Sequence, residues 1–162
     1  MRKMCALLAA AGLTVGLAVL PGPAWAASSP LPASGTFLVT SATVNSVSTA
    51  DGNTIVVLTV SGISTGTFDG SFIETDREVV HPGGIVTEQG KGIQSGTLGT
   101  CGTGSAPFTA GFTGNGTTAS GRIQFVDQAA STSTPMKIQS VLRFTFNDVT
   151  GEGTYAGTYH CT

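Results

Sequence analysis

Apolar and polar residues alternate along this chain in short runs that are separated by turn residues. The clearest case is 136–147, where Ile138, Leu142 and Phe144 share one face and Arg143 lies on the other. Alternation with a period of two is typical of a strand with one buried face. Beyond residue 26, no stretch keeps the three-and-four spacing of an amphipathic helix. The pattern therefore predicts an all-β protein.

Eight runs rich in β-branched and aromatic residues predict eight strands. These are 35–43, 54–61, 65–80, 85–95, 105–113, 119–128, 136–147 and 153–161. Glycine, asparagine and proline lie between several of them, and these residues favour the tight turns of hairpins. Eight strands in hairpin order leave two exposed edges unless the sheet closes on itself. We therefore expect a single antiparallel eight-stranded β-barrel, with a β-sandwich as the alternative.

The first 26 residues have the pattern of a secretory signal peptide. Arg2 and Lys3 precede an apolar run over 5–20, and Ala24-Trp25-Ala26 has the small residues of a cleavage site. We expect cleavage before Ala27 and a secreted, extracellular protein. The remaining chain divides into an unstructured lead-in over 27–34, a barrel domain over 35–162 and, within that domain, a flexible loop at 129–134.

The charge of the chain excludes some partners. Seven Lys and Arg stand against nine Asp and Glu, and signal cleavage removes Arg2 and Lys3 from the basic side. An acidic protein lacks the basic stripe that releases counterions from nucleic-acid phosphates. We expect no nucleic-acid partner, and no membrane association after cleavage. The sequence leaves the oligomeric state open.

Two of the three cysteines remain after cleavage, because Cys5 lies in the signal segment. In an oxidising compartment Cys101 and Cys161 should pair as a disulfide. Metal binding by these thiols and His160 is the competing interpretation, but it leaves a zinc site incomplete. We expect no metal and no cofactor.

Two segments resemble a known family. Ala-Ser-Gly-Thr-Phe-Leu-Val-Thr at 33–40 and Thr-Gly-Glu-Gly-Thr-Tyr at 150–155 look like bacterial β-barrel proteins of unknown function. Those proteins are similar to the allene oxide cyclase and dirigent barrels. The resemblance implies a closed eight-stranded barrel and carries over no catalytic residue.

The most notable acidic string is Glu74-Thr75-Asp76-Arg77-Glu78, which resembles the catalytic strand of jelly-roll β-glucanases. In a strand, alternate carboxylates lie about 6.5 Å apart, near the roughly 5 to 5.5 Å of a retaining glycosidase pair. In that fold Arg77 would have to pack inward, which is costly for an unpaired charge. We therefore expect the three acids on a solvated face. A straight strand also spreads them too widely for calcium.

No residue is predicted to be catalytic. His81 lies at a Pro-Gly-Gly turn, where a lone histidine is more often merely exposed, and His160 lies on a strand beside a cysteine. Two classes of function remain open. The first is a non-catalytic barrel that binds a small apolar molecule or an envelope surface, and the second is a cyclase-like isomerase or a glycosidase. For a ligand in the barrel, the expected contacts are Ser140, Leu142, Phe144 and Tyr155.

Overall fold

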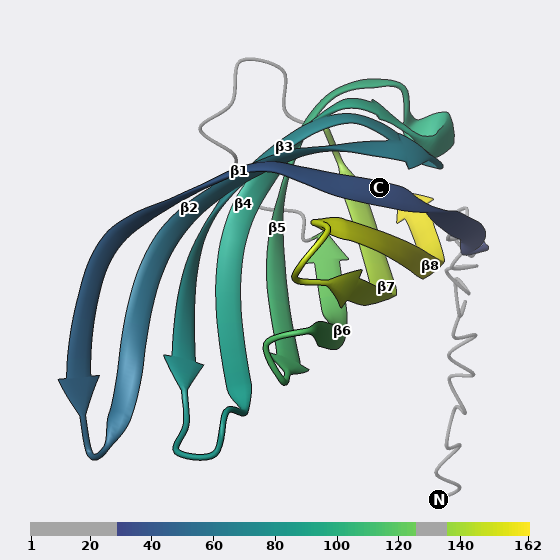
Figure 1. Ribbon diagram of the computed structural model, residues 1–162. Coiled ribbons are helices and arrows are strands. Elements are labelled where there is room, and N and C mark those ends of the chain that lie inside the picture. Colours follow the sequence, from purple (N-terminus) through teal and green to yellow (C-terminus); the bar gives the residue numbers. More distant parts are fainter. Residues whose placement is uncertain (1–28, 126–135) are drawn as a thin grey trace, which may run out of the picture.

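The chain forms a closed antiparallel barrel of eight strands, which confirms the predicted fold class and excludes the sandwich. The computed structural model describes residues 29–125 and 136–162 (Figure 1). The strands are β1 (Leu31–Ala50), β2 (Asn53–Gly66), β3 (Phe68–Val80), β4 (Val86–Leu98), β5 (Thr103–Gly114), β6 (Thr118–Phe125), β7 (Ile138–Asn147) and β8 (Glu152–Cys161). The expected signal peptide and the expected loop at 129–134 lie outside the described residues.

Neighbours in sequence are neighbours in the barrel, and β1 pairs with β8 to close it. This closing ladder runs over Leu31–Leu38, so the expectation of an unstructured lead-in is wrong for residues 31–34. Residues 31–34 form strand because their backbone groups hydrogen-bond to β8, whose edge would otherwise be unpaired. The expected strand over 65–80 is also divided, since β2 continues to Gly66 and β3 begins at Phe68.

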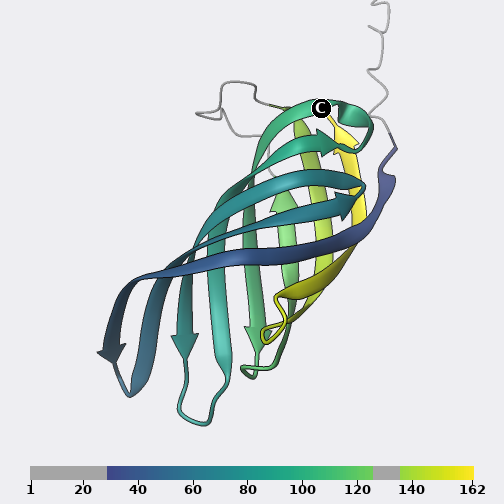
Figure 2. The same ribbon diagram turned by 45° about the horizontal axis from the view of Figure 1, so that its top comes forward.

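The barrel has two different ends. Strands β1 to β4 are longer than β5 to β8, and they curve past them at the end that carries the β3–β4 turn (Figures 1 and 2). We call this the β3–β4 end. The opposite end carries a short 3-10 turn, η1 (Gly99–Cys101), and the C-terminus of β8. We call it the disulfide end.

Aromatic rings fill the barrel toward the disulfide end. Phe68 stacks on Tyr155 with ring centroids 5.7 Å apart and meets Phe125 at 5.2 Å. The Tyr155 hydroxyl accepts a hydrogen bond from the Phe68 N–H at 2.9 Å and donates to the Thr65 carbonyl at 3.1 Å. A buried tyrosine needs such partners for its polar tip. These contacts give the barrel a packed floor.

A disulfide joins Cys101 to Cys161, with the Cα atoms 5.4 Å apart, as the sequence predicted. It ties η1 to the last residues of β8. The described residues include no helix that is both long and apolar enough to cross a membrane.

Loss of the disulfide should destabilise the fold measurably. The bridge spans 60 residues of sequence, and a closed loop of that size restricts the unfolded chain strongly. We expect Cys161→Ser to lower the free energy of unfolding by about 2 to 4 kcal/mol, measured by urea denaturation. In the same assay, wild-type protein treated with a reductant should lose a similar amount. Two thiols that titrate in the native oxidised protein would contradict the prediction.

Candidate binding cavity in the barrel

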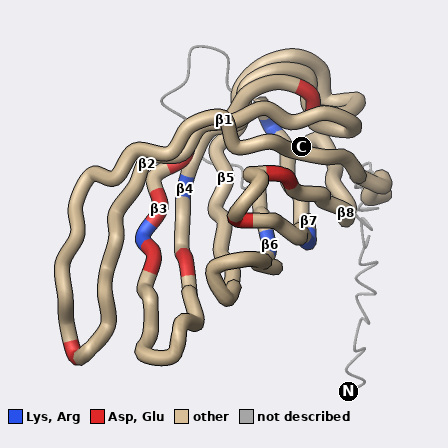
Figure 3. The backbone as a smooth tube through the Cα atoms, in the orientation of Figure 1, with Lys and Arg blue, Asp and Glu red and all other residues tan. Residues whose placement is uncertain are grey.

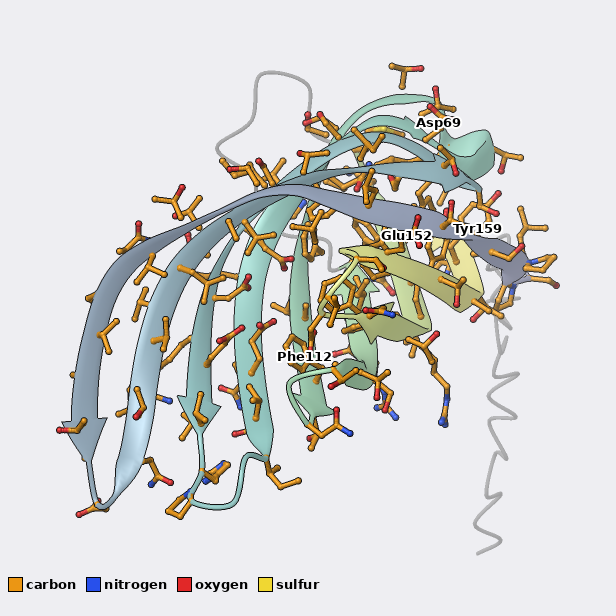
Figure 4. All side chains as sticks on the ribbon, in the orientation of Figure 1. Asp69, Phe112, Glu152 and Tyr159 are labelled. Carbon is orange, nitrogen blue, oxygen red and sulfur yellow. A yellow bond between two sulfur atoms is a disulfide. The ribbon has the colours of Figure 1, made fainter. Side chains whose placement is uncertain are left out.

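A cavity of about 380 Å³ lies inside the barrel above the aromatic floor. That volume is within the range of small-molecule sites. Most of its wall is apolar, and five strands contribute phenylalanine rings. Phe37 packs on Phe146 with ring centroids 5.7 Å apart, and Phe144 meets Phe112 edge to face at 6.2 Å. Figure 4 labels Phe112 on β5.

Three acidic residues of β3 face this cavity, so the expectation of a solvated face is wrong. Glu74, Asp76 and Glu78 all line it, whereas Thr75 and Arg77 are exposed on the outer surface. The cause is the two-residue period of the strand: the acids share the face of Phe68 and Phe72. Because successive side chains of a strand point to opposite faces, an outward Arg77 places the neighbouring carboxyls of Asp76 and Glu78 inside the barrel.

A fourth acidic residue, Glu88 on β4, also lines the cavity, and it was not among the residues predicted from the sequence. Glu88 lies directly opposite Glu78 in the β3–β4 ladder and is 8% exposed. Figure 3 shows acidic positions on both of these adjacent strands. The ladder thus brings together four carboxyl groups from two strands.

Glycines on β4 make room for the acids. Gly90 pairs with Asp76 and Gly92 with Glu74. A Cβ at Gly90 would overlap the Asp76 carboxyl, and a Cβ at Gly92 would lie 2.6 Å from the Glu74 Cβ. The absence of side chains at these two positions lets the carboxyls lie against β4, inside the barrel.

Burial makes these carboxyls hard to ionise. It raises the pKa of Glu88 to about 10, with added repulsion from the acids of β3. Burial and repulsion by Asp76 raise the pKa of Glu74 to about 8. For Asp76, burial and repulsion by Glu78 raise the pKa to about 7. Desolvation and mutual repulsion are the ordinary causes of such shifts.

The acids differ in exposure, and the most exposed of them lies at the rim of the cavity. Asp148, in the β7–β8 turn, is exposed at the rim, and burial raises its pKa. Glu78 is half-buried, and burial raises its pKa too. Asp76 is only 2% exposed. The entrance to the cavity is therefore acidic and its floor is aromatic.

No basic side chain compensates the acids within the described residues. All five Lys and Arg there are exposed on the outer surface, and none lines the cavity. The Oδ1 atom of Asp76 and the Oε2 atom of Glu74 are buried and receive no hydrogen bond from an N–H or hydroxyl group of a described residue. The Glu74 and Asp76 carboxyls interact with each other. Buried carboxylate oxygens are normally paired.

The acids are not arranged as a metal centre. In the described part of the chain, no three His, Cys, Asp or Glu residues are grouped so that they could hold a metal ion.

Of the four expected ligand contacts, three line the cavity: Leu142, Phe144 and Tyr155. Ser140 is buried but is not part of the lining, and its hydroxyl accepts a hydrogen bond from the Phe125 N–H at 3.3 Å. The alternation of residues in β7 predicts this inward position, but no local pattern indicates the backbone partner on β6.

The two histidines lie away from the cavity lining. His81 joins the two hairpins at the β3–β4 end, because one ring nitrogen contacts the Asn53 Oδ1 and the other the Thr87 Oγ1, each at 3.0 Å. His160 pairs with Gln139 in the β7–β8 ladder. Two ring contacts favour a structural role for His81.

No protein-family model matches the sequence, and neither does any curated protein.

Proposed function

We propose that this protein is a secreted, non-catalytic barrel that binds a small apolar or aromatic molecule in its lumen. The observation that carries the proposal is the cavity of about 380 Å³, which is closed by an aromatic floor and walled by phenylalanine. Such a chamber removes apolar ligand surface from water, which is the main source of affinity for small apolar molecules.

Other features support the extracytoplasmic part of the proposal. The Cys101–Cys161 disulfide is typical of oxidising compartments. The basic and apolar segment with its Ala-Trp-Ala end is typical of an export signal. The proposed kinship with bacterial barrels similar to allene oxide cyclase and dirigent proteins rests on the segments at 33–40 and 150–155.

The cavity is tested with a neutral probe. We expect tert-butylbenzene to bind the wild-type protein, as measured by saturation-transfer NMR and calorimetry. Ala110 lines the cavity, and Ala110→Phe should weaken this binding at least about tenfold because the new ring occupies the chamber. Ala156 is exposed on β8, so Ala156→Phe adds the same ring outside and should leave binding unchanged. Absence of binding by wild-type protein would overturn the proposal.

The buried acids favour a second candidate, an isomerase or glycosidase. Carboxyls with raised pKa values are typical of general acids, and Glu74 and Glu88 keep their protons near neutral pH. The test is hydrolysis of an aryl glycoside, measured as release of the aryl alcohol. Activity in the wild-type protein that is absent in Glu88→Gln would establish a glycosidase instead of a non-catalytic binding protein.

A further inference from the structure

The lumen combines two surfaces of different chemistry. The floor and most of the wall are aromatic, whereas the β3 and β4 wall carries Glu74, Asp76, Glu78 and Glu88. A chamber built only for a neutral apolar molecule gains nothing from four carboxyls, because their burial costs free energy. The acids therefore need an explanation beyond apolar binding.

Asp76 is the most informative member of the cluster. Its side chain is 2% exposed and lines the cavity, and its Oδ1 atom receives no hydrogen bond from an N–H or hydroxyl group of a described residue. The polar group beside it is another acid, the Glu74 carboxyl. The absence of a side chain at Gly90 makes room for this oxygen, which lies against the β4 backbone. A carboxyl in the cavity lining that has no basic partner gains from a charge-assisted contact with a cationic ligand.

We infer that the natural ligand is a small organic cation, an aromatic or aliphatic amine or quaternary ammonium, with its charge at Asp76 and Glu88 and its apolar part on the phenylalanine floor. The inference rests on the proposed function, since it specifies the ligand of the same cavity. A cation in this position replaces the positive charge that the described protein residues do not supply.

Two further observations favour a cation of this type. Phe112 lies opposite Glu88 in the β4–β5 ladder, so a cation near that carboxyl also lies beside an aromatic ring. Cations are attracted to aromatic faces, and more strongly when both are desolvated. An inorganic ion fits less well, because the described acids are not grouped for metal coordination.

The acidic residues at the rim of the cavity should attract a cation toward the entrance. Asp148 and Glu78 lie nearer the solvent than Asp76, and Asp148 repels Glu78 when both are charged. A cleft lined by one sign of charge concentrates ligands of the opposite sign and speeds their association. The rim should therefore set the rate of association, and the inner acids should set the affinity.

The test compares two probes of the same shape. Phenyltrimethylammonium and tert-butylbenzene differ in one atom and one charge, so their affinity ratio isolates the charge. By calorimetry at pH 8 we expect the cation to bind at least about tenfold more tightly, as a desolvated charge-assisted contact would give. Its affinity should rise from pH 6 to pH 8 with release of protons, because binding ionises the carboxyls. The groups that face the ligand site are Glu74, Asp76, Glu78, Glu88, Asp148 and Tyr155.

Matched variants assign the effect to the inner acids. Asp76→Asn and Glu88→Gln should each reduce the preference for the cation to about threefold or less, without weakening tert-butylbenzene. Asp69 lies on the same strand as Asp76 but is exposed near the disulfide end (Figure 4), and Glu152 is exposed on β8. The corresponding controls, Asp69→Asn and Glu152→Gln, should keep the full preference.

The outcomes separate the two proposals. The cation inference would be overturned if wild-type protein bound tert-butylbenzene as tightly as phenyltrimethylammonium, or more tightly. It would also be overturned if the preference for the cation remained in both Asp76→Asn and Glu88→Gln. Either result would leave the proposal of an apolar binding cavity unaffected. Binding of neither probe would overturn both. Displacement of phenyltrimethylammonium by millimolar Ca²⁺ would show an inorganic-ion site and would also reject the inference.

Discussion

We expect the free energy of unfolding of the ligand-free protein to fall by about 4 kcal/mol or more between pH 5 and pH 9. In the unfolded chain the acids of the cavity ionise near their ordinary pKa values of 4.5 for glutamate and 3.8 for aspartate. In the folded barrel, burial raises the pKa of Asp76 to about 7, of Glu74 to about 8 and of Glu88 to about 10. Urea denaturation across this pH range measures the effect.

The sign follows from proton binding. Between the unfolded and folded pKa values, the folded state holds protons that the unfolded state has lost, so raising the pH favours unfolding. The stability that these groups contribute is complete below about pH 4 and is lost as the pH rises through 7 to 10. One pKa unit in one group corresponds to about 1.4 kcal/mol, so about one effective unit in each of three acids accounts for the expected fall.

Variants locate the pH effect in the cavity. Glu88→Gln cannot ionise, so its stability should fall less steeply with pH and should exceed that of the wild type at pH 9. Glu152→Gln removes an exposed carboxyl and should leave the slope unchanged. A wild-type stability that stays constant from pH 5 to pH 9 would show that the acids are not buried as described.

The barrel could be predicted from the sequence because its signals are local. Alternation identifies each strand, and glycine-rich turns identify hairpin order. Cys101 and Cys161 were predicted to pair because they are the two cysteines left after the expected signal cleavage. The start of β1 was missed because 31–34 contain proline, serine and alanine, whose strand conformation depends on the partner edge of β8.

The orientation of the acids was mispredicted because their charge was taken to place them on the outer surface. The two-residue period of the strand, which sets them on the same face as its phenylalanines, was not applied. Glu74 shares the face of Phe72, and the intervening Ile73 is 54% exposed, the reverse of the usual assignment of polar and apolar positions. Glu88 was missed for a different reason. Its proximity to Glu78 depends on the β3–β4 register, and no feature near position 88 itself indicates that register.

Glycines that allow two strands to approach closely should be among the most sensitive positions in the protein. Gly157 on β8 lies opposite Leu142 on β7. A Cβ at Gly157 would overlap the Val141 carbonyl oxygen and would lie 2.9 Å from the Leu142 Cα. Both atoms belong to the backbone of the neighbouring strand, so rotation of a side chain cannot relieve the overlap. The β7–β8 ladder would have to separate where it covers the aromatic core.

We therefore expect Gly157→Val to lower the free energy of unfolding by about 4 kcal/mol or more, at the upper end for a single substitution. The matched control is Ala156→Val, one residue earlier on the exposed face of the same strand. It should change stability by no more than about 0.5 kcal/mol, since a β-branched residue suits a strand. Urea midpoints of the two variants measure the difference. Equal midpoints would mean that β8 does not approach β7 as closely as its register requires.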